Sequence, residues 1–209
     1  MGNVIITEVI VKKIPSIFHR KERSSLVDQT QVNPDCQWVF EQSQVCITVK
    51  RDGTPVRYWN GGGWHQRRTL ASKNGEPLVA PVDFMPVQDT PTYDDESKKM
   101  EWPGWVPLDT QYEGILQEAL RLSVPLYHGC TYELCGPKVN GNPERLSVHQ
   151  LFSHGVEEVG MTVPLTPQRL IETVQGLSHE GVVVYELIGL RRMAKLKRRD
   201  LGLAWPLPQ

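Results

Sequence analysis

Short apolar runs separated by turn-forming residues constrain the fold of this chain most strongly. β-Branched residues are concentrated in 4–11, and similar runs occupy 36–41 and 45–50. Runs of this length and composition predict strands. The sequence contains 17 glycines and 16 prolines, which supply the turns between such strands. The beginning of the chain is therefore expected to be rich in β-structure.

The segment 45–63 has the pattern of two strands and two turns. Lys50-Arg51-Asp52-Gly53 ends the first strand, 56–59 form the second, and 60–63 contain consecutive glycines. This order predicts a hairpin with Gly53 in its turn. No G-x-x-x-x-G-K-[ST] pattern follows the glycines, so we assign them to a loop rather than to a phosphate-binding site.

Two segments have helical patterns. Apolar residues recur at helical spacing in 111–123. Thr166 and Pro167 provide an N-cap and a first helical residue, and Gly176 ends the pattern. The many prolines between 71 and 110 predict irregular loops there instead.

The remaining apolar runs predict short strands at 130–135, 146–152, 182–187 and 193–196. These strands do not alternate regularly with helices, so the sequence favours an α+β fold with antiparallel sheets and few helices. A chain of 209 residues has the length of one substantial domain, and we expect a single domain over 1–209.

Charge and hydropathy limit the partners of the protein. A formal net charge of −1 excludes binding to nucleic acid through overall charge, so such binding needs a local basic patch, and 191–199 is one. The N-terminus has no basic segment followed by a long apolar one, and no apolar run is long enough for a membrane span. We therefore expect a cytoplasmic protein with no membrane partner.

The cysteines favour free thiols. Cys36, Cys46, Cys130 and Cys135 are unevenly spaced and follow no secretory signal. A zinc site formed by His128, Cys130, Cys135 and His149 is an alternative, but the C-x-x-C spacing typical of such sites is missing.

The end of the strand at Lys50 places an amine and a carboxylate together. Side chains alternate along a strand, so Lys50 and Asp52 project to one side while Gly53 permits the turn. A lysine attacks phosphorus only when deprotonated, which requires its pKa to fall below the ordinary value of about 10.4. Desolvation or neighbouring cations produce that change. An exposed hairpin with a surface ion pair is the alternative interpretation.

Three further segments carry charged residues in strand patterns. Glu133 lies within an apolar strand, and Glu180 directly precedes another. Lys195 and Lys197 are two residues apart, so both amines point to one face and suit a triphosphate. Solvent-facing strand residues are the alternative for each of these segments.

Together, these segments resemble the motifs of the covalent nucleotidyltransferase superfamily of DNA ligases, RNA ligases and mRNA capping enzymes. They are most similar to those of ATP-dependent RNA ligases. Lys50-Arg51-Asp52-Gly53-Thr54 matches the K-x-D-G nucleophile motif, and 132–136, 180–183 and 195–197 resemble the third, fourth and fifth motifs. Four motifs in the family's order are far more specific than any one of them.

The resemblance implies the nucleotidyltransferase fold, ATP as substrate and Mg²⁺ or Mn²⁺ as cofactor. Lys50 would carry AMP, Glu133 would hold the ribose, and Asp52 with Glu180 would place the metal ion. Arg68 resembles an arginine that contacts the nucleotide or its sugar, and Phe152 an aromatic residue that stacks on the base. The implied nucleotide-binding set is Lys50, Gly53, Arg68, Glu133, Phe152, Glu180, Lys195 and Lys197.

The activity implied by the resemblance has three steps, which suit RNA repair. The enzyme is adenylated on Lys50, AMP passes to an RNA 5′-phosphate, and a 3′-hydroxyl then attacks with release of AMP. A GTP-dependent capping-type enzyme, a DNA ligase and a non-catalytic nucleotide- or RNA-binding module are the alternatives.

The sequence departs from DNA ligases and capping enzymes after the fifth motif. Those enzymes carry an oligonucleotide-binding barrel there, whereas 198–209 are too short for one. This difference and Thr54 favour an RNA ligase. We expect a minimal catalytic domain that contacts RNA phosphates through Arg191, Arg192, Arg198 and Arg199.

Overall fold

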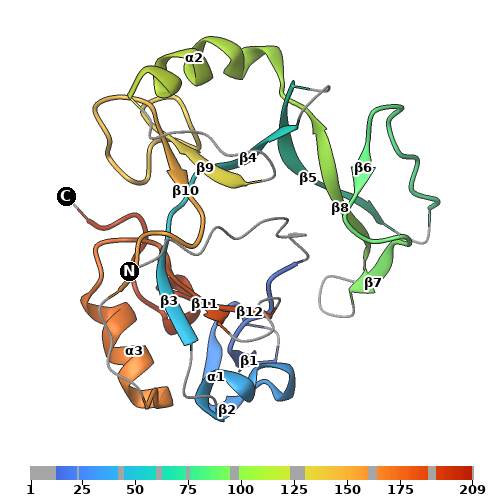
Figure 1. Cartoon of the computed structure of the whole chain (residues 1–209). Coiled ribbons are helices and arrows are strands. Elements are labelled where there is room, and N and C mark those ends of the chain that lie inside the picture. The colour runs from blue at the N-terminus through green and yellow to red at the C-terminus, as the bar shows by residue number, and fades with distance from the viewer. Residues whose placement is uncertain are drawn as a thin grey trace. The chain divides into compact units, whose positions relative to one another are not determined.

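The computed structural model describes residues 13–22, 24–41, 45–59, 63–73, 76–94, 99–122, 130–159, 164–187 and 192–208. Within these residues the chain is a mixed α+β structure with antiparallel sheets and few helices (Figure 1), as the sequence predicts. The strand expected at 4–11 and most of the loop expected at 60–63 lie outside them. No helix in these ranges is long and apolar enough to cross a membrane.

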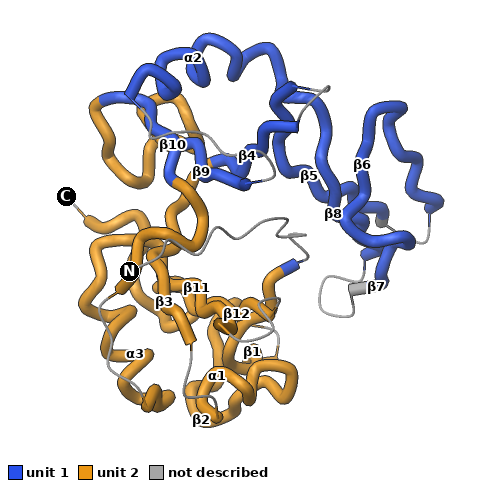
Figure 2. The backbone as a smooth tube through the Cα atoms, in the orientation of Figure 1, with its two compact units in different colours: residues 1–13, 54–134, 148–152 blue, residues 14–53, 135–147, 153–209 orange. Residues whose placement is uncertain are grey.

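Contacts between residues divide the chain into two compact units (Figure 2). Unit 1 consists of 1–13, 54–134 and 148–152, and unit 2 of 14–53, 135–147 and 153–209. The chain passes from unit 2 to unit 1 between Gly53 and Thr54, directly after the predicted nucleophile motif. The expectation of one catalytic domain over 1–209 stays a prediction.

In its described part, unit 2 contains a three-stranded antiparallel sheet in the order β12–β11–β3 and a two-stranded sheet formed by β1 and β2. The strands are β1 (Phe18–Arg20), β2 (Val27–Val32), β3 (Val45–Lys50), β11 (Gly181–Glu186) and β12 (Met193–Lys197). The helical elements are η1 (Pro34–Cys36), α1 (Trp38–Glu41), α3 (Pro167–Gly176) and η3 (Arg199–Leu201).

One face of the three-stranded sheet contributes to the core of unit 2. Ala194 and Leu196 of β12 are fully buried in a cluster that includes residues of β11 and α3. Because side chains alternate along a strand, Lys195 and Lys197 point to the opposite face. The alternation predicted for this strand is therefore confirmed.

The two predicted helices are also confirmed. α3 begins where expected, because Pro167 is its first residue and the Thr166 hydroxyl accepts a hydrogen bond from the Arg169 N–H at 3.3 Å. The pattern at 111–123 corresponds to α2 (Glu113–Leu122), which follows the short helix η2 (Thr110–Tyr112).

Unit 1 is built on a sheet in the order β10–β9–β4–β5–β8–β6, with β7 paired to β8. Its strands are β4 (Thr54–Trp59), β5 (Gly63–Lys73), β6 (Met85–Pro86), β7 (Thr92–Asp94), β8 (Lys99–Pro107), β9 (Thr131–Cys135) and β10 (Gln150–Ser153). Val56, Tyr132 and Leu134 of this sheet are fully buried, as is Ala119 of α2.

The strand predicted at 36–41 is wrong, because this segment is helical. The Asn33 side chain accepts a hydrogen bond from the Asp35 N–H at 3.1 Å, and Pro34 starts the short helix η1. α1 follows and buries Trp38 and Val39 in the core of unit 2. A local cap and tertiary burial therefore override the β-propensity of the apolar residues.

The hairpin predicted around Gly53 is wrong as well. β3 pairs with β11, whereas β4 pairs with β5 and β9. Both strands exist at the predicted places, but they belong to different sheets. Strand propensity is local, whereas the choice of partner depends on residues more than 100 positions away in the case of β3.

The loops predicted between 71 and 110 are only partly present. β8 pairs with β5 along its whole length, from Lys99 opposite Lys73 to Pro107 opposite His65. The backbone of Pro103 faces the side of β6, because its carbonyl accepts a hydrogen bond from the Val87 N–H at 3.0 Å. The N–H that proline lacks is therefore missing on that side, and the pairing of β8 with β5 is unaffected.

Candidate functional site

The register of the three-stranded sheet brings two of the predicted lysines into one row. Gly181 of β11 lies opposite Lys50 of β3 on one side and opposite Lys197 of β12 on the other. Residues directly opposite one another in antiparallel strands point to the same face. Lys50 and Lys197 therefore lie on either side of a glycine that has no side chain of its own, and Lys195 follows on the same face.

Glu180 connects the two lysines of this row. The Lys50 Nζ donates a hydrogen bond to Glu180 Oε2, and the Lys197 Nζ lies 3.8 Å from Glu180 Oε1. Only 7% of Glu180 is exposed. Burial raises the pKa of Glu180 above its ordinary value, although the charge of Lys50 and its hydrogen bond oppose this shift. The nearby Asp52 raises the pKa further.

The amine of Lys195 is strongly perturbed. Burial lowers the pKa of Lys195 to about 8, and the positive charges of Lys197 and Lys50 contribute in the same direction. A cation with this pKa loses its charge within the range in which enzymes are assayed. The face therefore holds three amines and a buried carboxylate, which is the arrangement expected of a site for a polyanionic ligand.

Gly181 lies too close to β12 to carry a side chain. A Cβ added to Gly181 would lie 2.1 Å from the Leu196 carbonyl oxygen and 2.8 Å from the Lys197 Cα. Both are backbone atoms of the paired strand, so they cannot move aside by a change of rotamer.

We expect Gly181→Ala to destabilise unit 2 by about 2 kcal/mol, because the new methyl group forces β11 and β12 apart. Urea denaturation followed by circular dichroism measures the change. Gly176→Ala is the matched control, since beyond its chain neighbours and its own helix backbone no heavy atom lies within 4 Å of an added Cβ there. Equal stability of the two variants would contradict the close approach.

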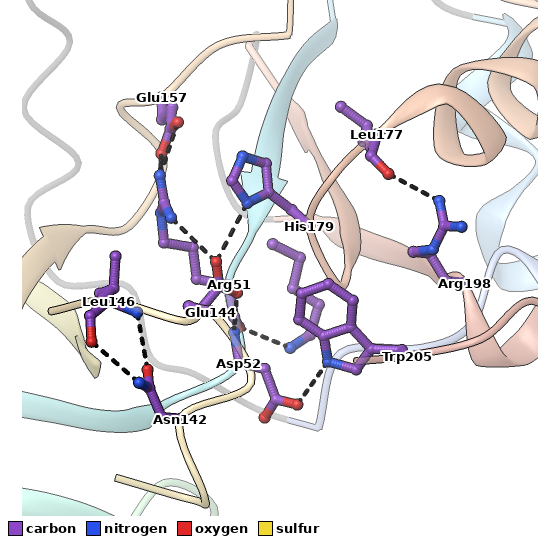
Figure 3. A network of polar contacts seen from close by, with 11 residues as sticks. Arg51, Asp52, Asn142, Glu144, Leu146, Glu157, Leu177, His179, Arg198 and Trp205 are labelled. Atoms are coloured by element: carbon purple, nitrogen blue, oxygen red, sulfur yellow. Dashed lines mark hydrogen bonds and ion pairs between the residues drawn. The ribbon is translucent and has the colours of Figure 1, made fainter. Parts of the chain in front are cut away.

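A buried carboxylate fixes the backbone at Arg51 and Asp52, within the segment predicted to hold the nucleophile (Figure 3). The side chain of Glu144 is 2% exposed. Its Oε1 accepts from the Asp52 N–H at 3.0 Å, and its Oε2 accepts from the Arg51 Nη1 at 3.1 Å and lies 3.2 Å from the His179 Nδ1. Arg51 also donates from its Nε to Glu157 at 3.0 Å. Glu144 therefore fixes the position of Arg51 and Asp52, although Glu144 itself lies outside the predicted segment 50–54.

The pKa of Glu144 reflects these contacts. Burial by itself raises the pKa of a carboxyl group, but the hydrogen bonds from His179 and from the Asp52 N–H, together with the charge of Arg51, bring the pKa of Glu144 below its ordinary value. Glu144 is thus ionised in the folded protein at neutral pH and accepts several hydrogen bonds.

A turn with left-handed residues presents Glu144 to the motif. Asn140 and Asn142 have φ angles of 48° and 56°, which asparagine tolerates better than most residues. The Asn142 side chain accepts from the Leu146 N–H at 2.9 Å and donates to its carbonyl at 3.0 Å. The Asn140 Nδ2 donates to the Gly53 carbonyl at 2.6 Å. The asparagines give a sequence signal for a turn, but nothing local indicates that it holds the motif.

The C-terminal segment reaches the same motif. The indole Nε1 of Trp205 donates a hydrogen bond to Asp52 Oδ2 at 2.8 Å (Figure 3). No local pattern in the sequence indicates this role of Trp205, because the contact joins residues 153 positions apart. Asp52 is therefore held at two points, at its N–H by Glu144 and at its carboxylate by Trp205.

In unit 1, the strand register decides which residues share a face with Glu133. The directly opposite pairs are Pro55 with Glu133, Arg57 with His65, and Arg67 with Trp105. Alternate residues of one strand and opposite residues of neighbouring strands point to the same side of a sheet. Glu133 therefore shares a face with Arg57 and Arg67, whereas Arg68 lies on the other face.

The contacts of Arg67 agree with this register. Its Nη1 donates to the Gly104 carbonyl at 3.0 Å, and its guanidinium lies 5.9 Å from the centre of the Trp105 ring. Burial lowers the pKa of Arg67 to about 10, with a further contribution from Arg57. Arg68 is exposed. Arg67 therefore shares the face of Glu133, and a contact of Arg68 with the nucleotide or its sugar stays a prediction.

Phe152 lies on β10, the strand next to β9, which carries Glu133. Leu151 is 5% exposed and Phe152 is partly exposed, so the two side chains occupy opposite faces of the strand. The role of Phe152 as a base-stacking residue stays a prediction.

The predicted site residues are thus distributed over both units. Unit 2 brings together Lys50, Asp52, Gly53, Glu180, Lys195 and Lys197. Arg68, Glu133 and Phe152 belong to unit 1. Their participation in the same site as Lys50 stays a prediction.

The basic segment expected to contact RNA has other partners within unit 2. Arg198 is buried, and its Nη1 donates to the carbonyls of Val174, Gln175 and Leu177 at 3.1, 3.0 and 2.7 Å. Arg199 donates to the Trp205 carbonyl, and Arg192 pairs with Glu186. Arg191 lies outside the described residues. The expectation that Arg198 contacts phosphates is therefore wrong, because the end of α3 occupies its guanidinium.

The two metal hypotheses have different support. Among the described residues there is no group of three or more His, Cys, Asp or Glu side chains that could hold a metal ion, and His128 of the zinc alternative lies outside these residues. A Mg²⁺ or Mn²⁺ ion that reaches the site with a nucleotide needs only one or two protein carboxylates. Asp52 and Glu180, which interact electrostatically, fit that requirement.

No family model matches this chain, and no curated protein is significantly similar to it. The assignment of a function therefore depends on the residues themselves and on their geometry.

Proposed function

We propose that this protein is an ATP-dependent RNA ligase of the covalent nucleotidyltransferase type, which forms a Lys50–AMP intermediate. The observation that carries the proposal is the contact of the Lys50 amine with the buried Glu180, on a sheet face that also presents Lys195 and Lys197. These are the residues of the first, fourth and fifth motifs, and they meet although they lie far apart in the sequence.

The first chemical step is the transfer of AMP from ATP to Lys50. The lone pair of Lys50 Nζ attacks the α-phosphorus and forms a phosphorus–nitrogen bond. The bond from the α-phosphorus to the bridging oxygen breaks, and pyrophosphate leaves with that electron pair. Before the attack Lys50 must lose a proton, and Glu180 is placed to accept it because its carboxylate touches the amine.

The remaining charges of the face support this step. Lys195 and Lys197 offset the negative charge of the triphosphate and of the departing pyrophosphate. Asp52 and Glu180 would hold the divalent cation, which supplies further positive charge to the phosphate oxygens when bound. Glu144 holds the backbone of Asp52 through the Asp52 N–H.

The later steps use RNA ends. AMP passes from Lys50 to the oxygen of an RNA 5′-phosphate and regenerates the free amine. A 3′-hydroxyl then attacks the phosphorus of this RNA 5′-phosphate. The bond from that phosphorus to AMP breaks, and AMP leaves as the new phosphodiester forms. By resemblance, Glu133 holds the ribose and Phe152 stacks on the base. Arg67 takes the place of Arg68, since it shares the face of Glu133.

The proposal is tested by mixing the protein with Mg²⁺ and with ATP or GTP labelled on the α-phosphate, and by measuring label on the denatured chain. We expect labelling by ATP, with the label on the peptide that contains Lys50. Labelling by GTP alone would support a capping-type enzyme, and no labelling by either would support a non-catalytic module. Adenylated protein is then offered nicked RNA, single-stranded RNA and nicked DNA, of which we expect an RNA to be joined.

Lys195 predicts the pH dependence of ATP binding. Its pKa of about 8 means that it is charged below that pH and neutral above it. If the charged amine binds the triphosphate, the KM for ATP rises about tenfold between pH 7 and pH 9. The reason is that the fraction of protein molecules with a protonated Lys195 falls by the same factor. Lys195→Arg keeps its charge over this range and is expected to abolish the rise. The same rise in the arginine variant would contradict the role of Lys195.

A further inference from the structure

The hydrogen bond between Trp205 and Asp52 joins the last described segment of the chain to the nucleophile motif. The whole Trp205 residue is 7% exposed, so the indole N–H has little access to water as an alternative partner. The acceptor is Oδ2 of Asp52, and the Nε1–Oδ2 distance of 2.8 Å is that of a strong hydrogen bond to a carboxylate.

The position of Trp205 is fixed independently of Asp52. The Arg199 Nε and Nη2 donate to the Trp205 carbonyl at 3.2 and 3.1 Å, and the Arg198 Nε donates to the Ala204 carbonyl at 3.1 Å. Arg145 donates to the Leu207 carbonyl further along. The arginines expected to bind RNA thus anchor the segment that carries Trp205.

The main chain of Asp52 is fixed as well, since its N–H donates to the buried Glu144. With its backbone held, the carboxylate of Asp52 can still rotate about its side-chain bonds. The indole N–H removes that freedom, because it holds one oxygen and thereby sets the direction of the other. Carboxylates that bind cations are commonly oriented in this way by a second hydrogen bond.

We propose that Trp205 is a positioning residue that orients the Asp52 carboxylate toward the divalent cation of the nucleotide. This inference rests on the proposed function, in which Asp52 and Glu180 hold that ion. It adds a residue from outside the four motifs to the site, and it assigns the C-terminal segment a part in metal binding.

The first test compares Trp205→Phe, which removes the indole N–H and keeps an aromatic ring, with Trp102→Phe. Trp102 is the matched control because its Nε1 donates to the Gln88 carbonyl at 2.9 Å in unit 1, in which Asp52 does not lie. In Trp205→Phe the Mg²⁺ concentration that gives half-maximal labelling of Lys50 is expected to rise about tenfold, with the rate at saturating Mg²⁺ within about twofold. An unchanged Mg²⁺ requirement would overturn the proposal.

Binding of Mn²⁺ in the presence of ATP, measured by the electron paramagnetic resonance of the free ion, gives a readout without turnover. We expect the dissociation constant for Mn²⁺ to rise about tenfold in Trp205→Phe and to stay unchanged in Trp102→Phe. Equal weakening in both variants would overturn the proposal, because it would indicate a general loss of stability.

A third measurement needs no Trp205 variant and no activity. The indole N–H signal of Trp205 is followed by nuclear magnetic resonance in the parent protein and in Asp52→Ala, and its exchange with solvent is expected to be about tenfold faster in the variant. Equal exchange would overturn the contact. If the parent chain is not labelled by ATP while this exchange differs as expected, the proposed function fails and the contact between Trp205 and Asp52 stands.

Discussion

We expect Lys50→Arg to lower the rate at which ATP labelled on its α-phosphate labels the protein, by at least about 1,000-fold relative to the parent. The guanidinium keeps a positive charge beside Glu180 but has no lone pair available for attack on phosphorus. The substitution therefore removes the nucleophile and preserves the ion pair. The rate of labelling under saturating ATP and Mg²⁺, with the folded fraction checked by circular dichroism, measures the effect.

Two further variants separate nucleophilic attack from charge. Lys197→Ala removes an amine that interacts with Glu180 at 3.8 Å but leaves the nucleophile, so it should slow labelling without preventing it. Lys21→Ala removes a lysine outside the cluster and should label like the parent protein. Persistent labelling of Lys50→Arg would show that another residue carries AMP. Loss of labelling in Lys50→Arg together with normal labelling in Lys21→Ala would support the assignment.

Arg198→Met is expected to destabilise unit 2 by about 3 kcal/mol, because several charge-assisted hydrogen bonds of a buried guanidinium are lost. The carbonyls of Val174, Gln175 and Leu177 lie at the end of α3 and accept from one nitrogen of Arg198. Methionine replaces the aliphatic part of the side chain, so the loss of packing is small. Urea denaturation gives the free energy of unfolding.

Arg199→Met is the matched control for this substitution. Arg199 is an exposed neighbour that donates to one carbonyl, that of Trp205, and its replacement is expected to cost less than about 1 kcal/mol. If Arg198→Met were as stable as the parent protein and bound RNA more weakly, the role of Arg198 would be phosphate contact after all. The two variants thus decide between the sequence-based expectation and the structural assignment.

The part of the site that could be predicted from sequence depends on local patterns. The strands at 45–50, 182–187 and 193–196 are visible in their apolar runs, and the alternation of Lys195, Leu196 and Lys197 fixes which side chains share a face. The N-cap of α3 is equally local, since it involves Thr166 and its immediate successors. Each of these features is decided by the residues within a few positions, which is why the sequence reveals it.

The residues missed by sequence reasoning act over long separations. Glu144 and Trp205 both hold Asp52, at separations of 92 and 153 residues. Neither stands in a pattern that indicates such a contact. Arg68 and Arg67 are adjacent in the sequence, and only the pairing of β5 with its neighbours shows that Arg67 shares the face of Glu133.

The sequence by itself thus determined the α+β class, the principal strands of the candidate site, the two predicted helices and which charged residues stand at the ends of those strands. Tertiary structure decided that β3 pairs with β11 rather than with β4, which places Lys50 and Lys197 on either side of Gly181. It also decided that Arg198 caps α3 and that Trp205 holds Asp52. The physical reason is that propensity and alternation are properties of neighbouring residues, whereas strand pairing and buried hydrogen bonds depend on which distant groups satisfy one another once the core has formed.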